Sequence, residues 1–415
     1  MVDPAPLGLT SRLYVLLTKA LARIAPLYLR KRLARGKEDA ARWREKLGQT
    51  AALRPEGRLI WLHAVGVGEV MALRGLIEAL GRADPGLNFL VTSSARSSAS
   101  VFATGLPGRT IHQYLPLDAP PFLARFLDHW RPDLVIWAEQ DIWPAAVFAT
   151  YARGTPQVLV NARMGQESFG KRRRFKGLYR DVLARYEDIL AQDAASAVHL
   201  ASLGAVAPRV MGSLKAAAPV LPAKTAELER MVRMFAGRRV WVAASTHLED
   251  EAVAMAAQAQ LFTADPRWLL VLVPRDPNRH LAMELAFARR STGQVLAGEA
   301  VYLADTFGEL GLWYRLAQAA LIGGGFSKVE GHNPWEPAAL GVAVLHGPRV
   351  ANFAADYATL HGVDAAREVN DSNDLIGDLN APDLAQVGAR AQALQRSAAP
   401  LDGLARDLLT RMRDG

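Results

Sequence analysis

The sequence of 415 residues contains no cysteine, which excludes a disulfide framework and any thiolate chemistry and is typical of a reducing compartment. Its nine histidines are scattered, with neither an HExxH pattern nor paired ligand spacing, so we predict no structural or catalytic zinc. The patterns GxxxxGK[ST] and GxGxxG are also absent. The sequence therefore favours neither an ATPase P-loop nor an NAD site.

The length and the charge distribution limit the class of protein. Single hydrophobic cores stop growing near about 250–300 residues, so two domains are expected. The net charge of +8 is concentrated in residues 1–50, which hold eleven Lys or Arg against four acids. A basic head on a nearly neutral body argues against a protein that binds nucleic acid along its length. It favours a local anionic surface, such as phospholipid head groups.

Residues 7–30 read LGLTSRLYVLLTKALARIAPLYLR and form the apolar part of this head. Arg12, Lys19 and Arg23 interrupt the apolar run too often for a spanning helix of about 20 residues. A signal peptide would carry its charges first. An amphipathic helix lying in the membrane plane fits better, although a helix packed on its own domain shows the same pattern. The cluster 171–176, KRRRFK, is a candidate for the same surface.

Beyond the head, short apolar runs alternate with helical stretches, which is typical of βαβ units and parallel sheets. The pattern restarts after residue 215, so we predict two Rossmann-like halves joined near 213–225. A helix is expected at 70–80, and the tail 382–413 is expected to be helical. The expected strands are 59–63, 88–92, 133–137 and 157–161 in the first half, and 239–244, 268–273, 319–322 and 342–345 in the second.

Polar turns follow three expected strands of the first half, where ligands of parallel sheets bind. Glu69 follows Gly66 and Gly68 at the start of a helix, where a carboxylate also simply complements the helix dipole. Glu139 and Asp141 come directly after a buried strand. A helix N-cap that precedes Pro144 explains these two acids equally well. The third turn is 161–163, NAR.

The second half has a different set of strand-end residues. Arg275 and Arg279 follow one strand, and arginine matches the oxygens of a phosphate. A further segment, 305–310, reads DTFGEL. The glycine run 323–325 is followed by the cluster 330–337, EGHNPWEP, which suits a nucleotide phosphate and its ribose. Glu336 is a candidate for hydrogen bonds with ribose hydroxyls.

Together these blocks resemble the 3-deoxy-D-manno-octulosonic acid (Kdo) transferases, which add Kdo from CMP-Kdo to a lipid A precursor. The resemblance covers nearly the whole chain. Its blocks are 63–69, 114–118, 139–144, 161–163, 244–247, 274–275, 305–310 and 331–341. It implies an α/β fold of the GT-B type, with two Rossmann-like domains facing across a cleft and an N-terminal membrane-associating helix. It also implies a monotopic inner-membrane enzyme on the cytoplasmic face, with no cofactor, no metal and no nucleic acid partner.

The resemblance also implies roles for residues. The catalytic set is Glu69 as the general base, with Glu139 and Lys215 as transition-state contacts. The CMP contacts are Pro274, Arg275, Phe307, Gly308, Glu309, Asn333, Pro334, Trp335 and Glu336. The expected domains are a basic head at 1–50, an acceptor domain at 51–215, a CMP-Kdo domain at 216–381 and a C-terminal helix at 382–415 that crosses back. The implied partners are CMP-Kdo, lipid IVA and an anionic membrane.

Two other interpretations remain open at this stage. One is a lipid-linked GT-B transferase that uses a UDP-sugar. The other is a non-catalytic protein that binds nucleotide or lipid at a membrane surface.

Overall fold

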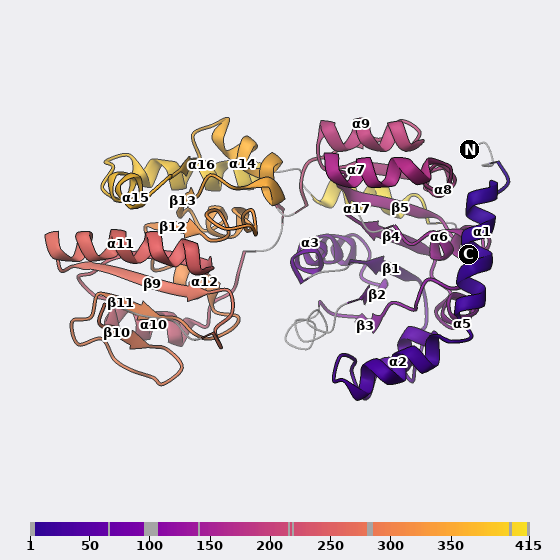
Figure 1. Ribbon diagram of the computed structural model, residues 1–415, viewed down its shortest axis with the longest axis horizontal. Helices are drawn as coiled ribbons and strands as arrows, with labels where there is room; N and C mark the ends of the chain where they lie inside the picture. The colour runs from indigo at the N-terminus through magenta and orange to yellow at the C-terminus, as the bar shows by residue number, and fades with distance from the viewer. Residues whose placement is uncertain are drawn as a thin grey trace. The chain divides into compact units, whose positions relative to one another are not determined.

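The computed structural model describes residues 5–64, 67–94, 107–139, 142–214, 216–217, 220–279, 285–397 and 401–412, with side chains for all of these except 67–72 and 397. The chain divides into two compact units, Met1–Ala218 with Ala399–Gly415, and Pro219–Ala398. Each unit contains a parallel seven-stranded sheet that is covered by helices (Figure 1). The expectation of two α/β halves is confirmed.

The sheet of the first unit has the strand order β3-β2-β1-β4-β5-β6-β7. Its elements, in chain order, are α1 (Leu9–Leu21), α2 (Ala25–Ala34), η1 (Trp43–Leu47), β1 (Leu59–His63), α3 (Val67–Ala83), β2 (Asn88–Ser93), β3 (Thr110–Tyr114), α5 (Pro120–Trp130), β4 (Leu134–Ala138), α6 (Pro144–Tyr151), β5 (Gln157–Ala162), α7 (Gln166–Arg172), η2 (Arg173–Phe175), α8 (Lys176–Leu183), β6 (Asp188–Ala191), α9 (Ala194–Leu203), β7 (Arg209–Val210) and, from the end of the chain, α17 (Leu401–Leu409).

The sheet of the second unit has the order β10-β11-β9-β8-β12-β13-β14. Its elements are α10 (Thr225–Met234), β8 (Arg239–Thr246), α11 (Leu248–Ala264), β9 (Trp268–Pro274), β10 (Phe287–Arg289), β11 (Val301–Leu303), α12 (Leu310–Tyr314), β12 (Ala319–Ile322), α13 (Trp335–Ala338), β13 (Ala343–His346), η3 (Ala351–Phe353), α14 (Ala354–His361), β14 (Ala366–Glu368), α15 (Ser372–Leu379) and α16 (Leu384–Ser397).

The central strands are apolar throughout because helices cover both faces of each sheet. In β1, Leu59 and Trp61 face one core cluster while Ile60 and Leu62 face the other, as the two-residue period of a strand requires. The buried indole of Trp61 donates a hydrogen bond to Thr92 Oγ1 at 2.8 Å. Buried polar atoms of large aromatic residues need such partners.

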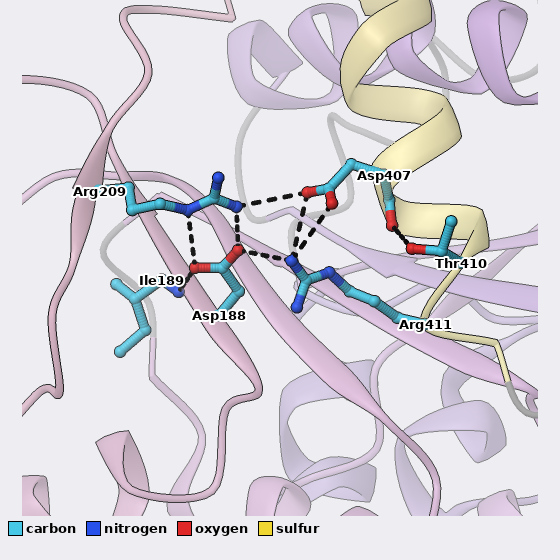
Figure 2. Close-up of polar contacts among 6 residues, drawn as sticks. All are labelled: Asp188, Ile189, Arg209, Asp407, Thr410 and Arg411. Carbon is cyan, nitrogen blue, oxygen red and sulfur yellow. Dashed lines mark hydrogen bonds and ion pairs between the residues drawn. The ribbon is translucent and has the colours of Figure 1, made fainter. Parts of the chain in front are cut away.

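The tail of the chain forms two helices that belong to different units. Helix α16 stays with the second unit, whereas α17 packs against α3 of the first unit, where Ala405 and Leu408 are buried in the core. Ion pairs also hold α17 against β6 and β7 (Figure 2). Arg411 Nη2 lies 2.9 Å from Asp188 Oδ2, and Arg209 Nη2 lies 3.3 Å from an oxygen of Asp407 on α17.

The head forms two helices rather than the single helix expected over residues 7–30. Helix α1 lies along α5, α6 and α8 of the first unit (Figure 1). Helix α2 begins at Ala25 and has Pro26 in its first turn, a position where proline is tolerated. Within the part of the chain that is described, no helix has the length and apolar content needed to cross a membrane.

Candidate functional site

The first candidate edge lies at the carboxyl ends of β1 and β4, where the chain order of the first sheet reverses. Such switch points are where open parallel sheets bind ligands. His63 ends β1, and its ring is fully buried, with Nδ1 2.9 Å from Thr92 Oγ1. Burial lowers the pKa of His63 to about 3, because the surroundings cannot solvate its charged form. His63 is therefore neutral at physiological pH.

Glu139 follows β4 in a backbone conformation that few non-glycine residues adopt. Its φ is +64°, and that of Asn161 at the end of β5 is +50°. Asn161 Nδ2 donates to the buried carboxylate of Glu139 at 3.2 Å, and Asn161 Oδ1 accepts from Leu214 N at 3.0 Å. These bonds connect the Glu139 carboxylate to the residue that precedes Lys215. Residues with a strained backbone that is held in place by surrounding contacts often lie at functional sites.

Helix capping does not explain Glu139, because another acid supplies that function. Helix α6 begins at Pro144 as expected, and Asp118 accepts hydrogen bonds from Ala145 N at 3.0 Å and Ala146 N at 2.8 Å. Tyr14 of α1 donates to the same carboxylate at 2.7 Å. Burial raises the pKa of Asp118 even though these three donors favour its charged form. Asp118 thus connects α1 to the helix that follows the Glu139 turn.

The side chains of two members of the expected catalytic set are not described by the structure. The backbone of Glu69 belongs to the first turn of α3, but its side chain is not among those described. Lys215 and Asp141 both lie outside the described residues. Their roles therefore stay predictions.

The second candidate edge lies at the carboxyl ends of β8 and β12, the switch point of the second sheet. A Cβ atom on Gly323 would lie 2.3 Å from the carbonyl oxygen of Ser245, and one on Gly325 would lie 2.6 Å from Gly347 N. Only glycine allows the backbone to approach this closely. Buried Asp250 holds the loop by accepting from Gly324 N at 2.7 Å and Phe326 N at 3.1 Å.

Arg275 and Glu336 belong to the same edge. Arg275 follows Pro274, the last residue of β9, and its side chain is exposed, while its backbone N–H donates to Thr246 O at 3.0 Å. Burial raises the pKa of Glu336, an effect that is opposed by a 3.3 Å hydrogen bond from Asn333 and by the charge of Arg275. An exposed cation and a half-buried acid thus lie close enough to influence each other.

The other expected CMP contacts differ in how much of their surface is exposed. Pro334 and Trp335 begin α13, and the buried indole of Trp335 donates to Asp356 Oδ1 at 2.7 Å, so the ring is part of the core. Phe307 is 71% exposed, and Gly308 has a φ of +81°.

The Glu309 carboxylate is already paired with another side chain. It accepts from Arg290 Nη2 at 2.6 Å and from Thr306 Oγ1. The hydrogen bond from Arg290 is the largest cause of its lowered pKa. The carboxylate of Glu309 is therefore engaged within the protein itself.

Comparison with known proteins agrees with this layout. A sequence model of the family described as 3-deoxy-D-manno-octulosonic-acid transferase (kdotransferase) matches residues 41–218. The 3-deoxy-D-manno-octulosonic acid transferase of Rickettsia bellii is 32% identical over 345 residues, which cover 81% of this chain and 82% of that protein. The chain belongs to this transferase family. It is therefore a glycosyltransferase.

Solved structures place the transferase among GT-B folds. The UDP-GlcNAc 2-epimerase of Neisseria meningitidis, bound to UDP-GlcNAc, superimposes with a TM-score of 0.55 at 11% identity, covering 86% of this chain and 99% of that one. The glycotransferase of kitacinnamycin gives a TM-score of 0.52 at 16% identity, covering 86% and 100%. At such low identity these likenesses concern the fold alone.

Sequence reasoning missed three features of the transferase's two edges. Asp118 and Asp250 are the carboxylates that organise the turns, and neither was assigned a role. Asp118 lies in the block 114–118 of the family resemblance, whereas nothing in the local sequence of Asp250 distinguishes it from a surface acid. The third feature is a pair of imidazoles, His247 and His332, whose Nε2 atoms are 3.0 Å apart. Both histidines lie in blocks of the family resemblance, and that was the only signal. They are separated by 85 residues, so spacing along the chain gives no hint of the contact.

Proposed function

We propose that this transferase moves Kdo from CMP-Kdo to a hydroxyl of lipid IVA, with inversion at the anomeric carbon, at the cytoplasmic face of the inner membrane. Its family membership supports the transfer of Kdo. The observation that carries the proposal further is the division of chemistry between the two sheet edges. The first edge holds a buried, oriented carboxylate, and the second holds close-packed glycines beside an exposed arginine.

In this proposal the acceptor hydroxyl attacks C2 of Kdo while the bond from C2 to the phosphate oxygen breaks. The proton of the hydroxyl passes to the Glu69 carboxylate, which acts as the general base. CMP leaves with the bonding electrons, and Arg275 stabilises the charge that grows on its phosphate. Glu139 faces the positive charge that develops at the sugar or orients Lys215, consistent with its link through Asn161 to Leu214.

Helix α1 supports the membrane part of the proposal because its leucines point away from the protein, while Ser11, Tyr14 and Val15 lie on the side that packs against it. Ser11 Oγ and Gly8 N both donate to buried Asp181 Oδ2 at 2.7 Å. The opposite side of α1 exposes Leu9, Leu13, Leu16, Leu17 and Leu21, and the next apolar residues along the chain, Ile24 and Leu27, are exposed as well. Each of these side chains has more than half of its surface in solvent. Solvent-facing leucines with polar groups beneath them suit insertion into the head-group boundary of a bilayer.

The cations of the head divide into two groups. Arg32 and Lys46 are paired with buried Glu38, and Arg42 is paired with Glu45, so these three stabilise the fold. The exposed ones, which remain available to lipid phosphates, are Arg12, Lys19, Arg23, Arg30, Lys31, Arg35, Lys37 and Arg44. Each basic residue near an anionic surface contributes about 1 kcal/mol to binding.

Mass spectrometry of lipid IVA after incubation with CMP-Kdo and the purified protein tests the proposal. We expect the acceptor mass to increase by whole Kdo units only when CMP-Kdo is present. In a parallel incubation, UDP-GlcNAc replaces CMP-Kdo as the donor. Product from UDP-GlcNAc alone would favour the lipid-linked UDP-sugar transferase. No product from either donor would favour a protein that only binds.

A further inference from the structure

The imidazole pair of His247 and His332 has a defined proton arrangement. His247 precedes α11 in a capping box, in which its side chain accepts from Asp250 N–H while the Asp250 carboxylate accepts from His247 N–H at 2.8 Å. Nε2 of the same ring is 3.0 Å from His332 Nε2, so Nδ1 is the atom that accepts from Asp250. In the neutral ring the proton is then on Nε2, and His247 donates to His332.

This arrangement determines what His332 offers to a ligand. Its Nε2 accepts from His247, so its proton is on Nδ1, which has no hydrogen-bond partner among the described residues. Burial, His247 and Arg275 lower the pKa of His332 to about 4, in agreement with a neutral ring. Tyr357 OH donates to the backbone oxygen of His332 at 3.2 Å and fixes the loop. The first turn of α11, His247 and His332 therefore form a chain of donors that ends on a free N–H.

A second imidazole pair in the same unit shows the contrast. His346 Nε2 is 2.9 Å from His361 Nε2, but Nδ1 of His346 is 2.7 Å from the carbonyl oxygen of Gly347 and donates to it. The buried ring of that pair, His346, therefore has no N–H left for a ligand. A metal does not explain the first pair, since no group of three or more His, Asp or Glu residues within the described ranges is arranged to hold one.

We infer that the His247–His332 pair binds the carboxylate of the sugar acid that is transferred, an assignment that rests on the proposed function. CMP-Kdo carries two anionic groups. Its phosphate gains charge as the bond breaks and needs a cation, which Arg275 supplies. Its carboxylate keeps one negative charge throughout and must stay electron-rich beside the positive anomeric carbon. A neutral N–H donor orients such a group without neutralising it.

The test compares CMP, which lacks the carboxylate, with CMP-Kdo. In His332→Phe we expect the Kd for CMP to stay within about threefold of wild type, while kcat/KM for CMP-Kdo falls about thirtyfold, the effect of one lost hydrogen bond to a charged group. His332→Asn keeps a donor near Nδ1 and should recover much of the loss. His361→Phe breaks the other imidazole pair and serves as the matched control.

His247→Asn provides a second route if His332→Phe does not fold. Asparagine is a good N-cap, so α11 keeps its start, but it is too short to reach His332. We expect about a tenfold fall in kcat/KM with unchanged CMP affinity. Equal losses for CMP and CMP-Kdo would assign the pair to the phosphate and overturn the inference, and so would no loss for either. If wild-type protein makes no product from CMP-Kdo, the proposed function fails instead, so the two failures are distinguishable.

Discussion

The two sheets have the same plan but different residues at their switch points. In each, the first strand, β1 or β8, lies in the interior, the chain adds strands on one side, and it then crosses to the other side at β4 or β12. At the first switch point, Glu139 and Asn161 adopt left-handed backbone conformations and hydrogen-bond to each other. At the second, glycines pack against Ser245 and Gly347, and the buried acid Asp250 binds loop N–H groups.

This difference shows how one fold supports two tasks. Both switch points contain non-glycine residues with positive φ, Glu139 and Asn161 in the first and Ser245 in the second, and such a backbone costs about 1–3 kcal/mol per residue. In the first unit this backbone orients a side-chain carboxylate. In the second, glycines let backbone segments approach closely, Arg275 stays exposed at the edge, and the buried acid Asp250 accepts hydrogen bonds from loop N–H groups. The first edge is suited to proton transfer and the second to binding anions. Changes at the two edges should therefore alter different kinetic quantities.

The largest expected effect separates catalysis from nucleotide binding. For Glu69→Ala we expect kcat to fall about a thousandfold, because loss of a general base removes the group that takes the acceptor proton. The Kd for CMP, measured by titration calorimetry, should not change. Glu78→Ala is the matched control, since Glu78 lies further along α3 and pairs with Arg74 at 2.9 Å on the surface. Turnover that persists in Glu69→Ala would remove Glu69 from the mechanism.

Arg275→Ala should show the opposite pattern. We expect the Kd for CMP to rise about 10–100-fold, since a charge-assisted hydrogen bond to phosphate is lost. Arg267→Ala is the control from the start of the same strand, where the arginine pairs with Asp265 at 2.9 Å. The comparison between the two edges would be wrong if Arg275→Ala left CMP affinity unchanged and lowered only kcat.

Local sequence patterns predicted the strands whose own residues form a buried apolar run. The apolar runs gave the central strands β1, β2, β4, β5, β8, β9, β12 and β13. They missed the others described, such as β7 with two residues and β3, which carries His112 and Gln113. Such strands are stabilised by their neighbours in the sheet rather than by an apolar run of their own.

The site was predictable only where its residues directly follow a strand. Glu139 and Arg275 were found in this way. The partner that orients Glu139 is distant in sequence, since Asn161 is 22 residues away. The acid at the start of the following helix is also distant, since Asp118 is 27 residues from Ala145. The sequence favoured an amphipathic helix with its apolar face away from the domain, and the leucines of α1 are exposed, but the pattern could not show which polar groups of the domain hold the helix. The hydrogen bonds of Ser11 with Asp181 and of Tyr14 with Asp118 show which side faces the protein.

The exposed leucines of α1 in the first unit allow a test with a smaller expected effect. We expect the double variant Leu13→Asp with Leu17→Asp to bind anionic vesicles about tenfold more weakly in a flotation assay, since two apolar side chains leave the head-group region. The melting temperature should stay the same because both leucines are more than half exposed. Val206→Asp, at an 82% exposed position of the same unit, is the control. Unchanged vesicle binding would assign the membrane contact to another surface.

The smallest expected effect concerns acid stability, in which the two units should resemble each other. Burial lowers the pKa of His63 in the first unit to about 3 and that of His346 in the second to about 4, against an ordinary value near 6.5. The unfolded chain therefore binds a proton at each position in a pH range where the folded protein does not. Stability is lost as pH falls below about 6.5, by about 1 kcal/mol per imidazole over the first pH unit. Asp118 and Glu336, whose pKa values are raised, act in the opposite direction, so the test must remove one imidazole at a time.

Urea unfolding of His63→Asn and His346→Asn at pH 7.0, 6.5 and 5.5 makes this comparison. Each variant is expected to be less stable than wild type at pH 7.0, because a buried ring is lost, yet to lose less stability on acidification. His129→Asn, at a half-buried position, controls for the substitution itself. If acid sensitivity disappears in only one of the two variants, the units differ in their cores as well as at their edges. Equal reductions would instead confine the difference between them to the switch points, where the first unit carries acids and the second carries glycines and cations.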